Sequence, residues 1–443
     1  MSTLKPPEEA DDLTAAPAEA AKLVPAAIAA QTLPEYLRAL KVRLTSGESG
    51  LLPVILGLII ITIVFQAISP HHVFLSAGNV VNLFQQSAVF MMLAMAEIFV
   101  LLLGEIDLSI GYGGAVGGVI AVQLVQPATS NWPWEAAIAI ALLSCAVIGG
   151  IQGTLITRLR LPAFIVTLAG LLILNGLLLI ILAFGPFSGY PSLAGQGANL
   201  RGIYNLMWGH VSPLQGWIAM GLIVALLGLS QILRDEGRRR SGLVAPPRSL
   251  TIAKIVVLAA VGITVVAVCN VNRAAAGKLE GVPWAIFIVL GVMGAYTVLL
   301  QRTQFGRYVY AIGGNAEAAR RAGINVAAIR TWCFVLCSFT AGIGGLLYAS
   351  YLGGMSNNVN GGQLVLYAVA AAVIGGVSLF GGRGKTVDGV LGGLVIGGIY
   401  NGMYLLGLSV QWEFIVTGGV LIFAVTVDAL SRRQATGGSA GAK

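Results

Sequence analysis

Charged residues are scarce in this sequence: 26 Lys and Arg and 18 Asp and Glu make up only 10% of the 443 residues. Soluble domains carry about 25% charged residues, and so few charges cannot cover the surface of a chain of this length. A water-soluble globular protein is therefore excluded. A disordered chain is excluded as well, because such chains are poor in aliphatic residues, whereas 57% of this sequence is hydrophobic.

Cysteine and histidine are also rare, and neither forms a cluster of metal ligands. Cys333 and Cys337 have the i,i+4 spacing of a helix, but no histidine or third cysteine lies near them. Cysteines in apolar runs are usually small packing residues. We therefore expect no metal site and no cofactor. The other residues of these two types are Cys145, Cys269, His71, His72 and His210.

Aromatic residues make up only 8% of the chain, whereas glycine occurs 59 times. This composition favours closely packed helices over a β-barrel, whose strands would alternate polar and apolar residues. The apolar residues instead form unbroken runs near the length at which a helix spans a bilayer, about 20 residues. We expect an all-α polytopic membrane protein with about 12 transmembrane helices, and no fewer than 10. The runs lie at approximately 51–68, 84–103, 108–123, 136–156, 162–184, 215–233, 252–269, 282–300, 331–351, 364–380, 387–405 and 412–429.

The sequence divides into four parts. Residues 1–31 are rich in Ala, Pro and acidic residues and are predicted to be a disordered tail; the first apolar run starts only near Leu51, so no cleaved leader is expected. Residues 32–48 place leucines on one helical face with basic residues around it, which is typical of an amphipathic helix at the membrane interface, although a solvated linker fits equally well. Residues 49–430 form the predicted transmembrane domain, and 431–443 form a second tail.

The positions of the basic residues predict the orientation of the chain. If the N-terminus is cytoplasmic and all twelve runs cross the membrane, 23 of the 26 Lys and Arg residues lie on the cytoplasmic side, as expected for a membrane protein. Only Arg201, Arg273 and Lys278 lie outside. Both tails are therefore predicted to be cytoplasmic. The same asymmetry explains the net charge of +8, so nucleic acid is not an expected partner.

A short polar element, residues 104–111, separates the second and third runs, and Glu97 lies deep in the run before it. Ionised carboxylates are costly in hydrocarbon and usually have a role there. Two interpretations stay open: a helix break that lines the translocation path or acts as a hinge, and a capped turn in which Asp107 bonds freed backbone N–H groups. The candidate residues are Glu97, Gly104, Glu105, Asp107 and Ser109.

Acidic residues are otherwise rare inside the predicted helices. A proton-driven carrier is expected to show several acids or histidines at mid-membrane, and only Glu97 is clearly there, so this class of transporter is not favoured. Asp388 begins the eleventh run close to Arg383 and Lys385, and we expect an ion pair with them.

The segment 381–386 reads Gly-Gly-Arg-Gly-Lys-Thr and is similar to the end of a phosphate-binding P-loop. The full motif requires a glycine at the position that Leu379 occupies, and the segment joins two apolar runs instead of following a soluble strand. No soluble stretch is long enough for a nucleotide-binding domain. We therefore expect no ATPase site and no enzymatic activity in this chain.

The largest cytoplasmic loop between predicted helices, residues 301–330, contains the signals of a very short helix. Asparagine is a good N-cap, an acid suits the first turn, basic residues suit the last turn, and glycine suits the position after the end. Two turns are too short to be stable alone, so the helix is either held laterally on the protein surface or docks into a cytoplasmic partner as a lever. Its signal residues are Asn315, Glu317, Arg320, Arg321 and Gly323.

Three segments together resemble one transporter family. Residues 303–324 are similar to the cytoplasmic coupling segment of monosaccharide-type ABC importer permeases, the family that includes ribose and xylose permeases. Residues 104–111 resemble that family's Gly-Gly-Ile-Asp-Leu-Ser-Val-Gly element, with Glu105 in place of a glycine. Residues 381–384 and 401–409 resemble its C-terminal signature. The arginine-rich loop at 234–251, between an extra pair of helices, is similar to the longer, xylose-type branch.

The resemblance implies a multi-pass permease subunit in the bacterial inner membrane, part of an ATP-driven importer for a monosaccharide such as xylose or a similar pentose or hexose. It further implies a homodimer, an extracytoplasmic sugar-binding protein and a separate ABC ATPase subunit. Coupling to that ATPase would fall on the short helix at 315–323. A branched-chain amino-acid ABC permease and a proton-coupled secondary transporter remain as alternatives; the latter would depend on Glu97.

Overall fold

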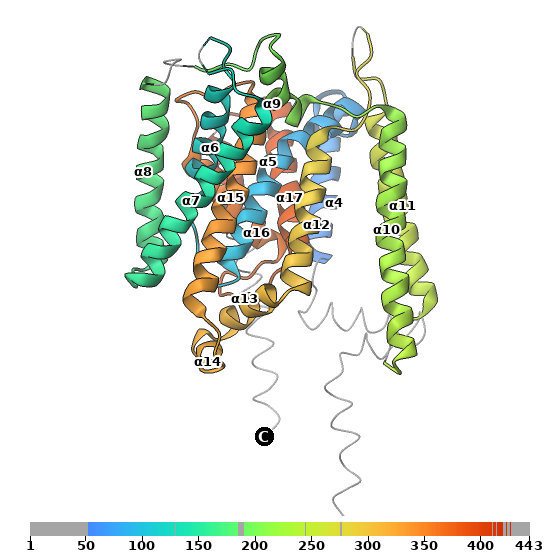
Figure 1. The fold of residues 1–443 in the computed structure, drawn as a ribbon. Coiled ribbons are helices and arrows are strands. Elements are labelled where there is room, and N and C mark those ends of the chain that lie inside the picture. The colour runs from blue at the N-terminus through green and yellow to red at the C-terminus, as the bar shows by residue number, and fades with distance from the viewer. Residues whose placement is uncertain are drawn as a thin grey trace, which may run out of the picture. The chain divides into compact units, whose positions relative to one another are not determined.

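The computed structural model describes residues 52–128, 130–184, 190–243, 245–274 and 277–409, together with 411, 412, 414–419, 422 and 426. In these residues the chain forms helices, two isolated β-bridges and no strand, which confirms the predicted all-α class for them (Figure 1). The predicted tails 1–31 and 431–443 and the predicted amphipathic helix 32–48 lie outside the described residues. In chain order the helices are α4 (Leu52–Ile68), the 3₁₀ helix η1 (Pro70–Leu75), α5 (Ala77–Leu101), α6 (Ile110–Leu124), α7 (Trp134–Arg158), α8 (Ala163–Phe184), α9 (Ala198–Trp208), α10 (Pro213–Arg240), α11 (Arg248–Cys269), α12 (Trp284–Arg302), α13 (Gln304–Gly314), α14 (Ala316–Arg321), α15 (Val326–Leu352), α16 (Gly361–Gly375) and α17 (Thr386–Leu405).

Seven of the described helices are long and apolar enough to cross a membrane: α5, α7, α8, α10, α11, α12 and α15. Three more, α4, α6 and α16, are apolar but shorter. Lengths and compositions of this kind fit a polytopic membrane protein. The last predicted run, 412–429, is described only in part. The count of twelve crossings and the cytoplasmic position of both termini stay predictions.

The chain divides into two compact units, and one of them is a hairpin formed by α10 and α11 over residues 217–265. Inside the hairpin Gly228 packs beside Ile255. Near its tip the Thr251 hydroxyl donates a hydrogen bond of 2.7 Å to the buried carboxylate of Asp235. Most of the large apolar side chains on both helices are exposed, as expected for helices surrounded by lipid.

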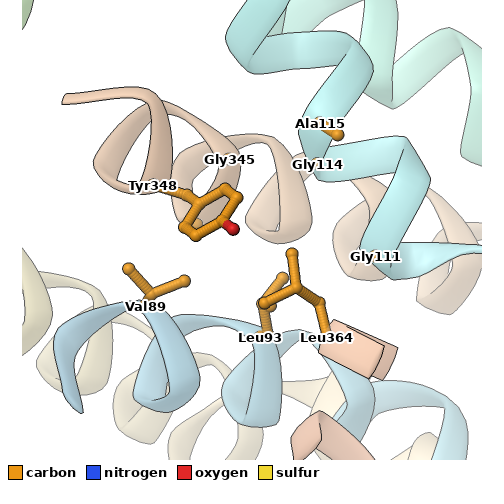
Figure 2. A pocket seen from close by; sticks show the side chains of 9 residues that line it. Val89, Leu93, Gly111, Gly114, Ala115, Gly345, Tyr348 and Leu364 are labelled. Atoms are coloured by element: carbon orange, nitrogen blue, oxygen red, sulfur yellow. The ribbon is translucent and has the colours of Figure 1, made fainter. Parts of the chain in front are cut away.

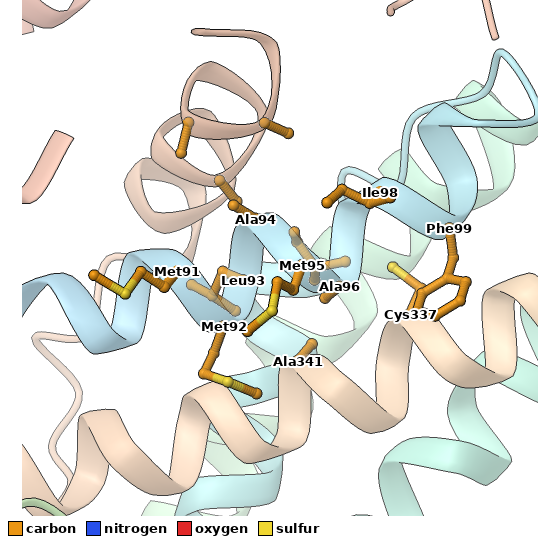
Figure 3. Packing of buried hydrophobic residues seen from close by; sticks show 14 of the residues in the cluster. Met91, Met92, Leu93, Ala94, Met95, Ala96, Ile98, Phe99, Cys337 and Ala341 are labelled. Atoms are coloured by element: carbon orange, nitrogen blue, oxygen red, sulfur yellow. The ribbon is translucent and has the colours of Figure 1, made fainter. Parts of the chain in front are cut away.

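The second unit holds the remaining described residues, and α5 and α15 form its centre. The two helices run antiparallel, because Gln86 contacts Tyr351 at one end while Glu97 lies near Cys337 further along. Figure 3 shows the core between them, where methionine and small side chains of α5 meet Ala341 of α15. Small residues at such contacts let helix backbones approach closely, which drives helix association in membranes.

The helices around this centre repeat one arrangement. A long helix is followed by a short one and a second long one in both α5–α6–α7 and α15–α16–α17. Each second long helix packs on the centre helix of the other group: Gly149 of α7 lies against Phe334 of α15, and Gly393 of α17 lies against Met91 of α5. Because α5 and α15 run in opposite directions, this arrangement is an inverted repeat, as found in many transporters.

The two short helices, α6 and α16, begin side by side. A Cβ atom on Gly111, near the start of α6, would lie only 1.9 Å from the carbonyl oxygen of Gly361, the first residue of α16. Gly114 of α6 packs on Ala341, so α6 starts beside the middle of α15. Each short helix has 15 residues and rises about 22 Å, less than the roughly 30 Å of a bilayer core. A small apolar pocket lies between these helices, α5 and α15; Figure 2 shows its lining residues Val89, Leu93, Gly111, Gly114, Ala115, Gly345, Tyr348 and Leu364.

Helix α9 is not expected from the sequence, because it lies in a segment rich in glycine and serine between two apolar runs. Ile203 and Met207 bury one face of it. The indole N–H of Trp208 donates to the carbonyl of Ser350 at 3.0 Å, and its ring stacks on Tyr351. The helix is therefore fixed by the end of α15 and not by its own sequence alone.

Candidate functional site: the helix break and the coupling segment

The polar element at 104–111 lies where the chain stops being helical. Helix α5 ends at Leu101 and α6 begins only at Ile110. Gly104 has φ +78°, a left-handed conformation that glycine adopts without strain, and its N–H donates to the carbonyl of Leu101 at 2.8 Å. This glycine turns the chain back toward the interior, where α6 starts. We call residues 102–109 the helix break.

A buried hydrogen-bond network joins the helix break to the helices around it. Asp107 donates its backbone N–H to Glu97 Oε1 at 2.9 Å, and its own Oδ1 accepts from the backbone N–H and the hydroxyl of Ser109 at 2.9 and 2.6 Å. Gln152 of α7 donates its side-chain amide to the Ser109 hydroxyl at 2.8 Å. These contacts are those of a capped turn, the second of the two interpretations of Asp107.

Neither Glu97 nor Asp107 is accessible to solvent, and no ion pair reaches either carboxyl in the part of the chain that the structure describes. Burying a carboxyl without a cation is costly unless hydrogen bonds compensate. The Cys337 thiol lies 4.0 Å from the second oxygen of Glu97 and also interacts with the Asp107 carboxyl, whose Oδ2 has no other hydrogen-bond partner among the described residues. The structure thus places the two acids together, ten positions apart in sequence, as supports of the turn.

Glu105 points elsewhere and forms an ion pair with Arg330, near the start of α15. The two side chains are mostly buried, with 16% and 29% of their surface exposed. Burial raises the pKa of Glu105, and the charge of Arg330 opposes this shift only in part. No local sequence pattern marks Arg330 as a partner of Glu105, because 225 positions separate the two residues.

The predicted short helix in the 301–330 loop is present as α14, at the end of a longer helix, α13. The Asn315 side chain accepts a hydrogen bond from the backbone N–H of Ala318 at 2.9 Å, as an N-cap does. Glu317 pairs with Arg320 and with Arg321, the latter at 3.3 Å, and Gly323 has φ +84° after the last turn. We call residues 304–323 the coupling segment, after the part of the permease family that they resemble.

Most side chains of α14 are exposed. Ala319 is the one buried residue of the helix and anchors it to the protein. In contrast, 52% of the Glu317 side chain, 71% of Arg320 and 80% of Arg321 are exposed. Exposed ion pairs of this type contribute little to stability, so the charged face of α14 is available for contact with another protein.

Glycines join the coupling segment to the helix break by main-chain contact. A Cβ on Gly313 would lie 1.8 Å from the carbonyl oxygen of Leu102, and Gly382 donates its N–H to the same carbonyl at 2.9 Å. Gly381, with φ +83°, lies between the other two segments. We call this contact of residues 102–104, 313 and 381–382 the glycine junction. Each of the three segments on which the family resemblance depends therefore contributes residues to this junction, whereas 401–409, the second part of the C-terminal signature, lies at the far end of α17.

The prediction that Asp388 forms an ion pair with Arg383 or Lys385 is wrong. The Asp388 carboxylate accepts a hydrogen bond of 2.7 Å from the backbone N–H of Lys385, and neither the Lys385 ammonium nor the Arg383 guanidinium lies within ion-pair distance of it in the described structure. Asp388 is the third residue of α17, where a carboxylate reaches back to the backbone that precedes the helix. Helix capping therefore determines its position.

Sequence reasoning also missed an amide network between α5 and α17. Asn79 and Asn401 exchange side-chain hydrogen bonds at 2.8 and 3.0 Å, and Asn401 also donates to Gln86 at 3.0 Å. Gln86 in turn donates to the Tyr351 hydroxyl at 2.9 Å. The signal that could have found this network was the presence of amide side chains in otherwise apolar runs, because such groups need buried partners.

Comparison with known proteins agrees with this geometry. The sequence model of the family described as "Branched-chain amino acid transport system / permease component" matches residues 79–425. The xylose transport system permease protein XylH of Escherichia coli K12 is 32% identical over 390 residues, which cover 86% of this chain and 92% of the relative. XylH of Haemophilus influenzae is 32% identical over 384 residues, 85% of this chain and 95% of the relative. The ribose import permease protein RbsC of Escherichia coli K12 is 28% identical over 374 residues, 84% and 92% of the two chains. No solved structure matches. With a family match over most of its length and xylose and ribose permeases as relatives, the chain belongs to the permease components of this transport family and, within it, to the monosaccharide ABC permeases.

Proposed function

We propose that this chain is the transmembrane permease subunit of an ATP-driven importer, with xylose or a similar pentose or hexose as its cargo. The observation that carries the proposal is the similarity to xylose and ribose permeases over more than four fifths of the chain. The description of the family names branched-chain amino acids, but the relatives reported above are named as xylose and ribose permeases. A sugar is therefore favoured over an amino acid.

The proposed complex contains two copies of the permease, an external sugar-binding protein and a separate ATPase subunit, which hydrolyses the ATP. The permease domain comprises residues 49–430 in the bacterial inner membrane, with twelve crossings and with both tails, 1–31 and 431–443, in the cytoplasm. The distribution of basic residues supports this orientation. Residues 32–48 lie on the inner membrane surface.

The proposed ATPase contact is α14 and its flanking residues. The helix is short, capped at both ends and anchored by a single buried side chain. Its charged side chains are exposed in the free permease, and their ion pairs with one another contribute little to stability. They can therefore exchange these pairs for polar groups of a docking partner. The coupling residues are Asn315, Glu317, Arg320, Arg321 and Gly323. Glu97 of α5 and the helix-break residues Gly104, Asp107 and Ser109 are proposed to hold the start of α6, and not to contact the sugar.

The proposal is tested by transport into proteoliposomes that contain the permease, its ATPase subunit and the external binding protein. Labelled xylose, ribose and leucine are offered in turn, with and without ATP. We expect ATP-dependent accumulation of one of the sugars and none of leucine. Leucine accumulation alone would identify an amino-acid permease. Uptake that needs a proton gradient instead of ATP, and that the substitution E97Q abolishes, would identify a secondary transporter.

The coupling role of α14 is tested by the double substitution E317A/R321A. We expect ATP-dependent sugar uptake and sugar-stimulated ATP hydrolysis to fall by about fivefold or more, with unchanged insertion into the membrane. The control is E236Q/R240Q on α10, which removes an i,i+4 pair 3.9 Å apart together with the contacts of Glu236 with Arg239 and Arg248. Full coupled transport by E317A/R321A would contradict this role.

A further inference from the structure

The ion pair between Glu105 and Arg330 connects two parts of the molecule that the proposed function requires to move together. Glu105 lies in the helix break, next to the glycine junction. Arg330 lies in the second turn of α15, whose N-cap is Asn325, shortly after α14 ends. One side chain thus belongs to the segment that starts α6, and the other to the helix that follows the ATPase contact.

Only one of the two hydrogen bonds that an arginine–carboxylate pair can form is present between Arg330 and Glu105. A terminal guanidinium nitrogen of Arg330, Nη2, contacts Glu105 Oε1. Arg330 Nε and Glu105 Oε2 are both buried and have no hydrogen-bond partner among the described residues. These two atoms are the donor and the acceptor of the second bond in a parallel, two-bond arginine–carboxylate pair. A second bond between these two atoms would complete the pair without breaking the first.

Stability alone does not explain such a pair. Desolvation of two buried charges offsets most of their attraction, and a pair of well-packed apolar residues is often no less stable. Leaving one donor and one acceptor buried and unpaired adds a further cost. The alternative role of such a pair is to specify how the segments that carry it are arranged.

A second contact also links the helix break to this part of the molecule. Gly313, at the end of α13, touches the carbonyl of Leu102 at the glycine junction. The helix break therefore has two contacts with this region: the coupling segment itself reaches Leu102 through the main chain, and α15, which follows it, reaches Glu105 through Arg330. Two residues further on, Asp107 caps the turn from which α6 begins.

From these contacts we propose that Glu105 and Arg330 are positioning residues that transmit movement of the coupling segment to the short helix α6. The second hydrogen bond between them is open in the present arrangement and closes in another arrangement of the transport cycle. This inference rests on the proposed function, because it assumes an ATPase that moves α14. It assigns neither residue a contact with the sugar.

The variants R330K, E105Q, R330Q and the exchange E105R/R330E test the inference in the same proteoliposomes, with sugar accumulated per ATP hydrolysed as the readout. Lysine keeps the charge but cannot form the two-bond fork, so R330K is the most informative. We expect R330K, E105Q and R330Q to lower the ratio by about fivefold or more. The exchange variant is expected to recover at least half of the wild-type ratio. E236Q/R240Q serves as the control and keeps the wild-type ratio.

The outcomes separate the inference from the function on which it rests. If the wild-type complex shows no ATP-driven sugar uptake, the proposed function is wrong and the inference fails with it. If the wild type transports and R330K retains the full ratio of sugar to ATP, the inference alone is wrong. Thermal unfolding of each purified variant supplies the second measurement. A lower unfolding temperature together with an unchanged ratio would show that the pair is merely structural.

Discussion

The contact between α6 and α15 provides a direct test of how the centre of the molecule is packed. A Cβ atom on Gly345 would lie 1.8 Å from the carbonyl oxygen of Gly114, and 2.3 Å from its carbonyl carbon. Real Cβ atoms essentially never approach a heavy atom within 3.0 Å. Both neighbouring atoms belong to the main chain, so no side-chain rotation relieves the clash. The substitution G345A therefore forces the two helices apart by more than 1 Å along this contact.

The expected loss of stability in G345A follows from the effect of overpacking in other protein cores. Extra methylenes in a well-packed core cost about 1–3 kcal/mol, and a rigid backbone clash belongs at the upper end of this range. The matched control is G291A in α12, because a Cβ there meets nothing within 4 Å. Alanine is favoured over glycine in a helix by about 0.5–1 kcal/mol, so G291A is expected to be neutral or slightly stabilising.

The assay uses the protein's own thiols. All four cysteines are buried and unpaired, so a thiol-reactive dye labels them as the detergent-purified protein unfolds on heating. We expect G345A to unfold at a lower temperature than wild type, and G291A at the same or a higher temperature. A G345A protein at least as stable as G291A would refute the close packing of α6 on α15.

Three further predictions concern the junction, the amide network and the thiols. G313A is expected to lower the sugar transported per ATP, because its Cβ would displace the Leu102 carbonyl, whereas the adjacent G314A meets nothing within 4 Å and is expected to transport normally; equal ratios in the two variants would contradict the junction's role. N401A leaves the side chains of Asn79 and Gln86 short of partners and is expected to lower the free energy of unfolding by about 1–3 kcal/mol, which the same dye assay detects as a lower unfolding temperature. In the native protein at room temperature the thiols are expected to react slowly with a soluble disulfide reagent and rapidly after denaturation; fast labelling of the native form would show that the packing around them is open. The thiols are Cys145, Cys269, Cys333 and Cys337.

Local sequence signals predicted α14 well. A helix of this length is specified by its ends, and the N-cap at Asn315, the acid at Glu317 and the glycine at Gly323 are all neighbours in sequence. The turn around Asp107 was predictable for the same reason, although its sequence could not decide between a capping role and a role in the translocation path. The long apolar helices followed from their composition.

Contacts between distant residues could not be predicted in this way. The partner of Glu105 lies 225 positions away, and no local pattern marks Arg330 among the many basic residues of the chain. The ends of α16 carry local signals, the N-cap Asn360 and the left-handed Gly376, whereas the contact of Gly361 with Gly111 of α6 shows only in the assembled helices. Asp388 was misread because two basic neighbours in sequence looked like partners, whereas the nearest free donor was a backbone N–H.

The glycine junction is built from the main chain, and this has a consequence for how such a permease can diverge. Contacts between peptide groups do not depend on which side chains the neighbouring positions carry, provided that glycine stays at the points of closest approach. In the proposed complex, side chains elsewhere in the membrane helices can therefore change while the main-chain fit between residues 313, 381–382 and 102–104 is preserved.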